Sequence, residues 1–159
     1  MTSPTVELLQ AGPASIDILR DLLVQFRNEE GARSGSLAGV YKPAKLTEEI
    51  RQRLSSVDYN YRLLVANREV VGFTGFRRIS GPIGEFTAVF ILPSHRRKGL
   101  GRQAVLKTVI QMVAAGITDI RLEVHKDNEV SKKLLRDLGA SLSPVSTSYK
   151  VLLPGYLEG

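Results

Sequence analysis

The feature that most constrains the fold is a cationic, glycine-bearing segment between an apolar run and a helical pattern. The apolar run at 87–92 predicts a buried strand, and apolar residues recur at helical spacing over 99–115. Between them, residues 94–102 read Ser-His-Arg-Arg-Lys-Gly-Leu-Gly-Arg. This order places the unpaired N–H groups and the partial positive charge of a helix N-terminus beside four cationic side chains. The segment therefore predicts a site for a phosphate or pyrophosphate group.

Two glycines in this segment allow the backbone to come close to the anion. Neither Gly99 nor Gly101 has a Cβ that would keep a ligand away from the main-chain N–H groups. The backbone would hold the phosphate oxygens, and the side chains would supply the compensating charge. The residues that we expect to bind the anion are Arg96, Arg97, Lys98, Gly99, Leu100, Gly101 and Arg102.

The composition excludes several classes of protein. The chain has 159 residues, 43% of them hydrophobic, which suits a single domain over residues 1–159 with an ordinary core. It has no cysteine and only two histidines, so disulfides and thiolate chemistry are excluded, and we expect no metal. The N-terminus lacks a signal-peptide pattern, and no apolar run is long enough to span a bilayer. We therefore expect a cytoplasmic protein with no membrane partner.

The net charge of +6 is partly concentrated in one segment. Four of the 22 basic residues lie within 96–102, and the others are scattered among acidic residues, with no basic stripe interleaved with aromatic residues. This distribution favours a local anion site and predicts no nucleic-acid partner. The alternative, a basic nucleic-acid binder, predicts association that weakens steeply as the salt concentration rises.

The rest of the pattern predicts a mixed sheet covered by helices. We expect strands at 6–9, 61–66, 70–77, 85–92, 120–124 and within 141–153, and helices from 15 to about 31, from 47, over 99–115 and over 128–138. Gly- and Ser-rich residues 31–44 predict a loop. The strand–helix–strand order makes 85–92 and 120–124 parallel, whereas the preceding hairpin is antiparallel. The predicted fold class is α/β (α+β), with a mixed, mostly antiparallel central sheet, one parallel strand pair and helices on both faces.

The cationic segment also fits a known signature. Residues 96–101, Arg-Arg-Lys-Gly-Leu-Gly, match the Arg/Gln-x-x-Gly-x-Gly/Ala pattern of the GNAT superfamily of N-acetyltransferases, which bind acetyl-CoA there. The preceding strand end at 90–93, the strand at 122–124 and the Asn-capped helix at 128–138 resemble the family at the same intervals. The chain thus resembles this family over 85–140, and only in topology before that.

The resemblance implies direct transfer of an acetyl group from acetyl-CoA to a primary amine of a small-molecule or peptide acceptor. It implies that the pantetheine arm runs along Val89, Phe90 and Ile91, with Asn128 contacting it from the other side. It also implies a β-bulge near 88–90, which frees a main-chain N–H to polarise the thioester carbonyl. Many relatives are dimers, so a homodimer is an open alternative to a monomer.

The resemblance also bears on the catalytic groups. An amine of pKa about 10.4 must lose a proton before it attacks, and Glu85, fourteen residues before Gly99, is our candidate general base. The alternative interpretation of Glu85 is a solvent-facing carboxylate at a strand end. Leu135 stands where many GNAT enzymes have the tyrosine that protonates the departing thiolate. This departure leaves solvent, Tyr149 or Tyr156 as the acid, and it keeps open a second function, an acetyl-CoA-binding sensor domain without turnover.

Overall fold

The computed structural model describes residues 4–34, 43–125, 128–145 and 148–153. Its strands are β1 (Glu7–Gln10), β2 (Tyr59–Ala66), β3 (Glu69–Ser80), β4 (Ile83–Ile91), β5 (Asp119–His125), β6 (Ser141–Val145) and β7 (Ser148–Leu153). Its helices are α1 (Ile16–Ser34), α2 (Pro43–Ser55), α3 (Leu100–Ala114) and α4 (Glu129–Asp137), with short 3-10 turns η1 (Pro13–Ser15) and η2 (Pro93–His95).

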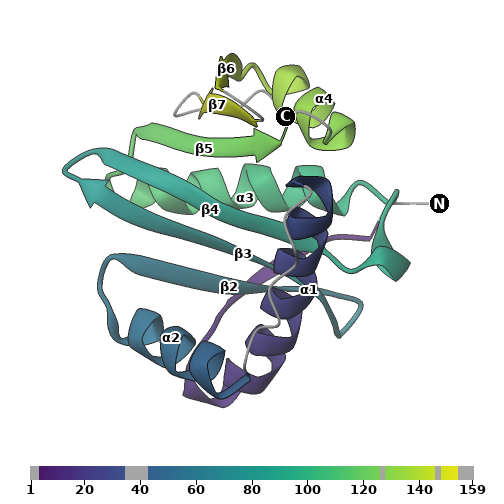
Figure 1. Cartoon of the computed structure of the whole chain (residues 1–159), viewed down its shortest axis with the longest axis vertical. Coiled ribbons are helices and arrows are strands. Elements are labelled where there is room, and N and C mark those ends of the chain that lie inside the picture. The colour runs from purple at the N-terminus through teal and green to yellow at the C-terminus, as the bar shows by residue number, and fades with distance from the viewer. Residues whose placement is uncertain (1–3, 35–42, 126–127, 146–147, 154–159) are drawn as a thin grey trace.

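The strands form one seven-stranded sheet in the order β1-β2-β3-β4-β5-β7-β6 (Figure 1). The pair β4–β5 is parallel, and the five other neighbouring pairs are antiparallel. The C-terminal strand β7 inserts between β5 and β6, so the last two strands extend the sheet beyond β5. Within the described residues, this confirms the mixed, mostly antiparallel sheet with one parallel pair.

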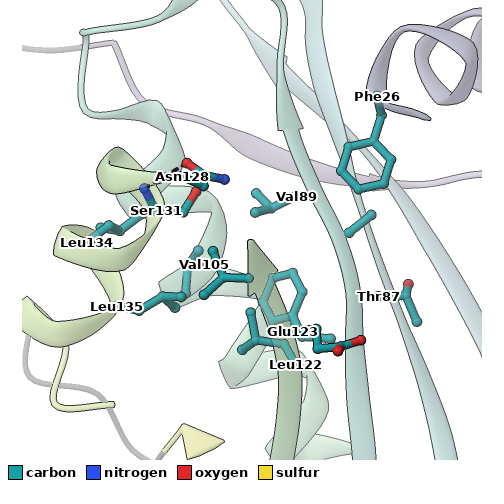
Figure 2. A pocket seen from close by; sticks show the side chains of 13 residues that line it. Phe26, Thr87, Val89, Val105, Leu122, Glu123, Asn128, Ser131, Leu134 and Leu135 are labelled. Atoms are coloured by element: carbon teal, nitrogen blue, oxygen red, sulfur yellow. Dashed lines mark hydrogen bonds between the residues drawn. The ribbon is translucent and has the colours of Figure 1, made fainter. Parts of the chain in front are cut away.

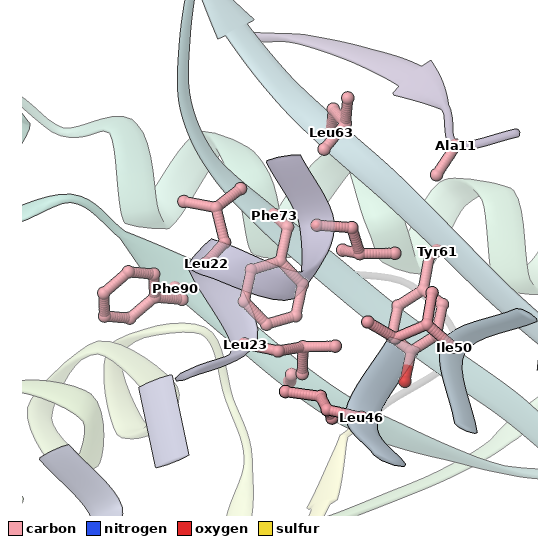
Figure 3. Close-up of a cluster of buried hydrophobic side chains, with 11 residues drawn as sticks. Ala11, Leu22, Leu23, Leu46, Ile50, Tyr61, Leu63, Phe73 and Phe90 are labelled. Atoms are coloured by element: carbon pink, nitrogen blue, oxygen red, sulfur yellow. The ribbon is translucent and has the colours of Figure 1, made fainter. Parts of the chain in front are cut away.

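Helices cover both faces of the sheet, as predicted. In Figure 1, α1 and α2 lie in front of the strands and α3 lies behind them. Figure 3 shows the core under α1 and α2, whose buried members are Ala11, Leu19, Leu22, Leu23, Leu46, Ile50, Tyr61, Leu63, Phe73, Ala88 and Phe90. The core under α3 and α4 contains Phe76, Phe86, Val105, Val109, Met112, Ile117, Ile120, Val124, Leu135 and Leu138.

Local sequence explains several element boundaries. The turn between β2 and β3 consists of Asn67 and Arg68, whose φ angles of 51° and 66° are those that a two-residue hairpin turn requires. The side chain of Asn128 accepts a hydrogen bond from the N–H of Ser131 at 3.2 Å and so caps α4, as expected. Gly139, with φ 88°, ends the same helix.

The predicted loop at 31–44 is wrong at both ends. Helix α1 continues through Ser34, and α2 begins at Pro43 rather than near residue 47. Proline fits the first turn of a helix because the N–H that it lacks has no partner there in any case. The middle of the predicted loop, 35–42, lies outside the described residues.

A β-bulge in β4 determines on which face of the sheet each side chain of this strand lies. The register passes from Gly75–Ala88 to Phe76–Phe86, so Thr87 is the extra residue, next to the predicted position near 88–90. Without the bulge, Phe86 and Phe90 would share a face, because side chains alternate along a strand. With it, Phe86 packs in the core under α3 and α4, whereas Phe90 packs in the core under α1 and α2.

The parallel pairing of β4 with β5 is short. It consists of Ile83–Asp119, Gly84–Ile120 and Glu85–Arg121. Beyond Glu85 the two strands run apart, as Figure 1 shows, and the opening between them widens toward their carboxyl ends. The carboxyl ends of parallel strands are where open α/β sheets bind ligands.

The carboxylate of Glu49 links α1 and α2, the two helices in front of the sheet in Figure 1. Glu49 of α2 accepts two hydrogen bonds from Arg27 of α1, at 3.2 and 2.9 Å, and lies 2.7 Å from the Arg53 guanidinium. The hydrogen bonds from Arg27 are the main reason why the pKa of Glu49 lies below its usual value. The charge of Glu49 therefore stabilises the contact between α1 and α2.

Replacing Glu49 with Gln tests this contact. At neutral pH we expect E49Q to lower the free energy of unfolding by about 1 kcal/mol, measured from urea transitions. Because the pKa of Glu49 is lowered in the folded state, its contribution is present above the unfolded pKa and is lost as the pH falls through the folded pKa. The difference between E49Q and wild type should therefore vanish in acid. E48Q is the control, since Glu48 pairs with Arg51 at the exposed surface; an equal loss in both variants would contradict the assignment.

Candidate functional site

The opening between β4 and β5 contains a cleft (Figure 2). It encloses about 600 Å³ of empty space, part of it open to solvent. Helix α4 forms one wall and β4 the other. The lining residues are Phe26, Phe86, Thr87, Ala88, Val89, Val105, Leu122, Glu123, Val124, Asn128, Ser131, Leu134 and Leu135. Mostly apolar walls with a few polar groups are typical of a site for a small ligand.

The cationic turn follows the carboxyl end of β4, where α3 begins. Arg97 and Gly99 both have left-handed φ angles, 64° and 75°. Left-handed residues in such a turn direct successive N–H groups to one side, and the N–H groups of the first turn of α3 have no partner within the helix. Arg97, Lys98 and Gly99 are exposed, so the N–H groups and charges of the turn are accessible to an anion.

The space above the two glycines is open. A Cβ built on Gly99 or on Gly101 meets no protein atom within 4 Å. The protein therefore leaves open the side of the turn from which a ligand would approach the backbone. The sequence prediction that this segment binds the pyrophosphate of a cofactor remains a prediction, and the local geometry suits it.

The side chain of Arg96 is engaged within the protein. Its Nη2 lies 2.6 Å from Oε2 of Glu29 on α1, and its Nε donates to the carbonyl of Ile91 at 2.8 Å. Its guanidinium also lies over the Phe90 ring, 5.4 Å from the centroid. Arg96 therefore connects the turn to β4 and to α1, a contact across 67 positions of sequence that the local pattern could not reveal.

The three residues expected along the pantetheine arm lie on different faces of β4. Val89 lines the cleft, whereas Phe90 and Ile91 are buried in the cores on either face of the sheet. Their side chains do not form a common surface. The shared feature is the backbone of β4 beyond Glu85, which no longer pairs with β5 in the described residues.

Two residues of α4 define the opposite wall. Asn128 lines the cleft while its side chain caps the helix, so its orientation is fixed by the bond to Ser131. Leu135 is buried, with 4% exposure, in the core under α3 and α4 and also lines the cleft. An apolar side chain thus occupies the position where many family members carry a tyrosine.

The two carboxylates on this part of the sheet have different surroundings. Glu85 lies at the closed end of the opening, in register with Arg121, and its Oε1 is 3.4 Å from Nε of Arg77. It does not line the cleft, whereas Glu123 does. Glu85 could be predicted from the sequence and Glu123 could not, because only the register shows that the strands have separated at residue 123. Among the described residues, no group of His, Cys, Asp or Glu is arranged to hold a metal ion.

The sequence profile of the acetyltransferase (GNAT) family matches residues 22–140. The chain belongs to this family. Membership supports acetyl transfer as the general activity, and the cationic turn, the cleft and α4 all lie within the matched region or at its end. A search of curated protein sequences gives no match. No helix in the described part of the chain is long and apolar enough to cross a membrane.

Solved acetyltransferases have the same fold. An acetyltransferase from Thermus thermophilus superposes with a TM-score of 0.75 at 18% identity, covering 97% of this chain and 99% of that one. PaiA N-acetyltransferase from Thermoplasma acidophilum, in complex with coenzyme A, gives 0.73 at 17% identity, covering 94% and 99%. Spermidine N-acetyltransferase from Vibrio cholerae, in complex with CoA and spermine, gives 0.81 at 13% identity, covering 95% and 96%. At these identities the likeness establishes the fold.

Gly101 offers a test of the anion site that leaves the fold intact. An Asp at this position suits the first turn of a helix, so G101D should fold with unchanged or slightly raised stability. Its charge would face the expected pyrophosphate, so we expect the Kd for coenzyme A to rise about tenfold or more by calorimetry. G101A is the control, because the added Cβ meets open space and the family signature allows alanine there. Equal affinities of G101D and G101A would contradict a pyrophosphate site at this turn.

The contact between Arg96 and Glu29 can be measured with a double-mutant cycle. We expect R96A and E29A to be coupled by about 0.5–1 kcal/mol in the free energy of unfolding, because the pair is only partly exposed. R96A should weaken coenzyme A binding as well if the Arg96 charge acts on the phosphates, as sequence analysis predicts, and E29A should not. Additive single-variant effects on unfolding would contradict a stabilising contact.

Proposed function

We propose that this protein transfers an acetyl group from acetyl-CoA to a primary amine of a small-molecule or peptide acceptor. The observation that carries the proposal is the cationic turn with two left-handed residues, placed where β4 ends and its unpaired edge borders the cleft. The relatives solved with CoA and with a polyamine support the same class of ligands. Acetyl-CoA supplies an activated thioester, so the protein needs mainly to bind, orient and exchange protons.

The chain's own groups suit these tasks. The N–H groups over 97–102 would hold the pyrophosphate, with Arg97 and Lys98 adding charge. The free backbone edge at 89–91 would pair with the amide groups of the arm, and Asn128 would face the arm from α4. The bulge at Thr87 changes the hydrogen-bonding pattern of β4 beside the cleft, where a main-chain N–H can polarise the carbonyl oxygen.

Proton exchange is the part of the proposed mechanism for which the chain offers the fewest candidate side chains. The amine must lose one proton, and Glu85 is the base predicted from sequence. The departing thiol has an ordinary pKa of about 8.5, so its thiolate can leave and take a proton from water. Leu135 supplies no hydroxyl group for this step, and solvent protonation is therefore the simplest scheme.

Acetyl transfer can be measured as free thiol released from acetyl-CoA. We expect release that depends on an added amine, tested with spermidine, L-lysine, a lysine-containing peptide and kanamycin. At acetyl-CoA concentrations below the Kd, G101D should slow the reaction about tenfold or more, in step with its weaker binding, and G101A should not.

Other outcomes identify the alternatives. A sensor domain would bind acetyl-CoA with measurable heat and release no thiol with any amine. A nucleic-acid binder would give no coenzyme A response but would bind duplex or single strands with an affinity that falls steeply with salt. Either result would overturn the proposed acetyl transfer.

A further inference from the structure

We infer that the cleft binds a donor whose acyl group is longer than acetyl, a propionyl or butyryl group, and that its hydrocarbon chain lies against the apolar end of the cleft. The inference deepens the proposed function and rests on it, because the same CoA thioester would carry the longer group. The observation behind it is the change in the cleft lining from partly polar to apolar along its length.

The apolar end of the cleft is continuous with the hydrophobic core under α3 and α4. Four lining residues are also buried members of that core: Phe86, Val105, Val124 and Leu135. They come from β4, α3, β5 and α4, so each of these elements contributes a core side chain to this part of the cleft. A hydrocarbon chain bound there would leave water for surroundings made of core side chains, which is favourable.

The polar lining residues lie nearer to the cationic turn. Toward the carboxyl end of β4, α4 presents Asn128 and Ser131 at the level of Val89 (Figure 2). Leu135 follows Ser131 by four positions, about one helical turn, and lies lower in the same view, at the level of Thr87. A ligand whose phosphates sit at the turn would therefore meet polar groups first and apolar groups last. The amides of a pantetheine arm suit the first part, and a hydrocarbon chain suits the second.

An acetyl group is too small to use this apolar end. In the proposed function the thioester lies beside the bulge at Thr87, so only atoms beyond its carbonyl carbon can reach Phe86, Val105 and Leu135. Acetyl has a single methyl group beyond that carbon. Apolar space that a ligand leaves unfilled forfeits dispersion contacts with its lining, and a longer chain gains them.

The strand pairing limits the length of the chain. Strands β4 and β5 are paired at Glu85–Arg121, which closes the opening between them. Thr87 lies two positions from Glu85, or at most about 7 Å along an extended strand. A propionyl or butyryl chain fits within this length, whereas an extended octanoyl chain exceeds it.

The transfer step is the same for each of these acyl groups. The neutral nitrogen of the acceptor, which has already lost one proton, forms a bond with the acyl carbonyl carbon. The bond from that carbon to sulfur breaks, and the thiolate takes a proton from water. The nitrogen then gives its second proton to solvent. The length of the chain changes none of these bonds, so it acts through binding alone.

The first test compares acetyl-, propionyl-, butyryl-, hexanoyl- and octanoyl-CoA as donors to the amine that wild type acylates fastest. Thiol release reports every donor in the same way. A fully buried methylene favours the reaction about fourfold, so we expect kcat/KM to rise at least about threefold from acetyl- to butyryl-CoA. Octanoyl-CoA should react more slowly than butyryl-CoA.

A matched pair of variants tests the position of the chain. Val105 and Val109 lie one turn apart on α3, are 2% and 1% exposed, and belong to the same core. Of the two, Val105 lines the cleft. We expect V105A to lengthen the apolar end and to raise the ratio of kcat/KM for hexanoyl-CoA to that for acetyl-CoA about fivefold or more. V109A should lose similar stability and leave this ratio unchanged. Because the ratio compares two donors on one protein, a smaller folded fraction does not alter it.

The other outcomes separate this inference from the proposed function. If acetyl-CoA is used at least as well as propionyl- and butyryl-CoA, the inference fails and acetyl transfer stands. A similar change of the donor ratio in V105A and V109A would also contradict it, as would octanoyl-CoA being the fastest donor. If no donor releases thiol, the proposed function fails and the inference fails with it. If butyryl-CoA reacts and acetyl-CoA does not, the inference holds and acetyl is the wrong group in the proposed function. If V105A does not fold, the wild-type donor series decides.

Discussion

The short parallel pairing between β4 and β5 is the constraint on which the candidate site depends. Three residue pairs hold the strands together, and the last of them is Glu85–Arg121. On its other side β5 forms six antiparallel pairs with β7, four of them beyond Arg121, so it stays in the sheet without further pairing with β4. The separation therefore costs β5 little pairing, and it creates a cleft whose walls are ordinary sheet and helix.

The bulge at Thr87 changes the face of the sheet on which the following side chains of β4 lie, close to the point where β4 and β5 separate. Before the bulge, Glu85 lies on the face covered by α1 and α2; after it, Val89 lies on the opposite face and lines the cleft. Gly75 is part of this arrangement, because a Cβ there would come within 2.7 Å of the Thr87 hydroxyl. Because of this one extra residue, Glu85, the base predicted from sequence, lies on the opposite face of β4 from the surface along which a bound pantetheine arm would run.

The amino-acid sequence was sufficient for the elements and for the cationic turn, because both depend on local patterns. Apolar periodicity located the strands, and clustered cations with two glycines located the turn. The sequence was insufficient to predict features that depend on contacts between residues far apart in the chain. The contact of Arg96 with Glu29, the extra residue at Thr87 and the position of Glu123 all follow from register or tertiary packing. The alternation of Phe86, Ala88 and Phe90 even suggests one face, because a bulge leaves no mark on an apolar pattern.

Charges of opposite sign lie at the cationic turn and in the lining of the cleft. Cations gather at the turn after β4, whereas the charged side chain among the described residues that line the cleft is the carboxylate of Glu123. The other walls of the cleft are mostly apolar, so a charged ligand group there interacts with the carboxylate more strongly than it would in water. An anionic group at the turn and a cationic group at β5 would each meet an opposite charge. A ligand pair placed in the reverse sense would meet like charges at both ends.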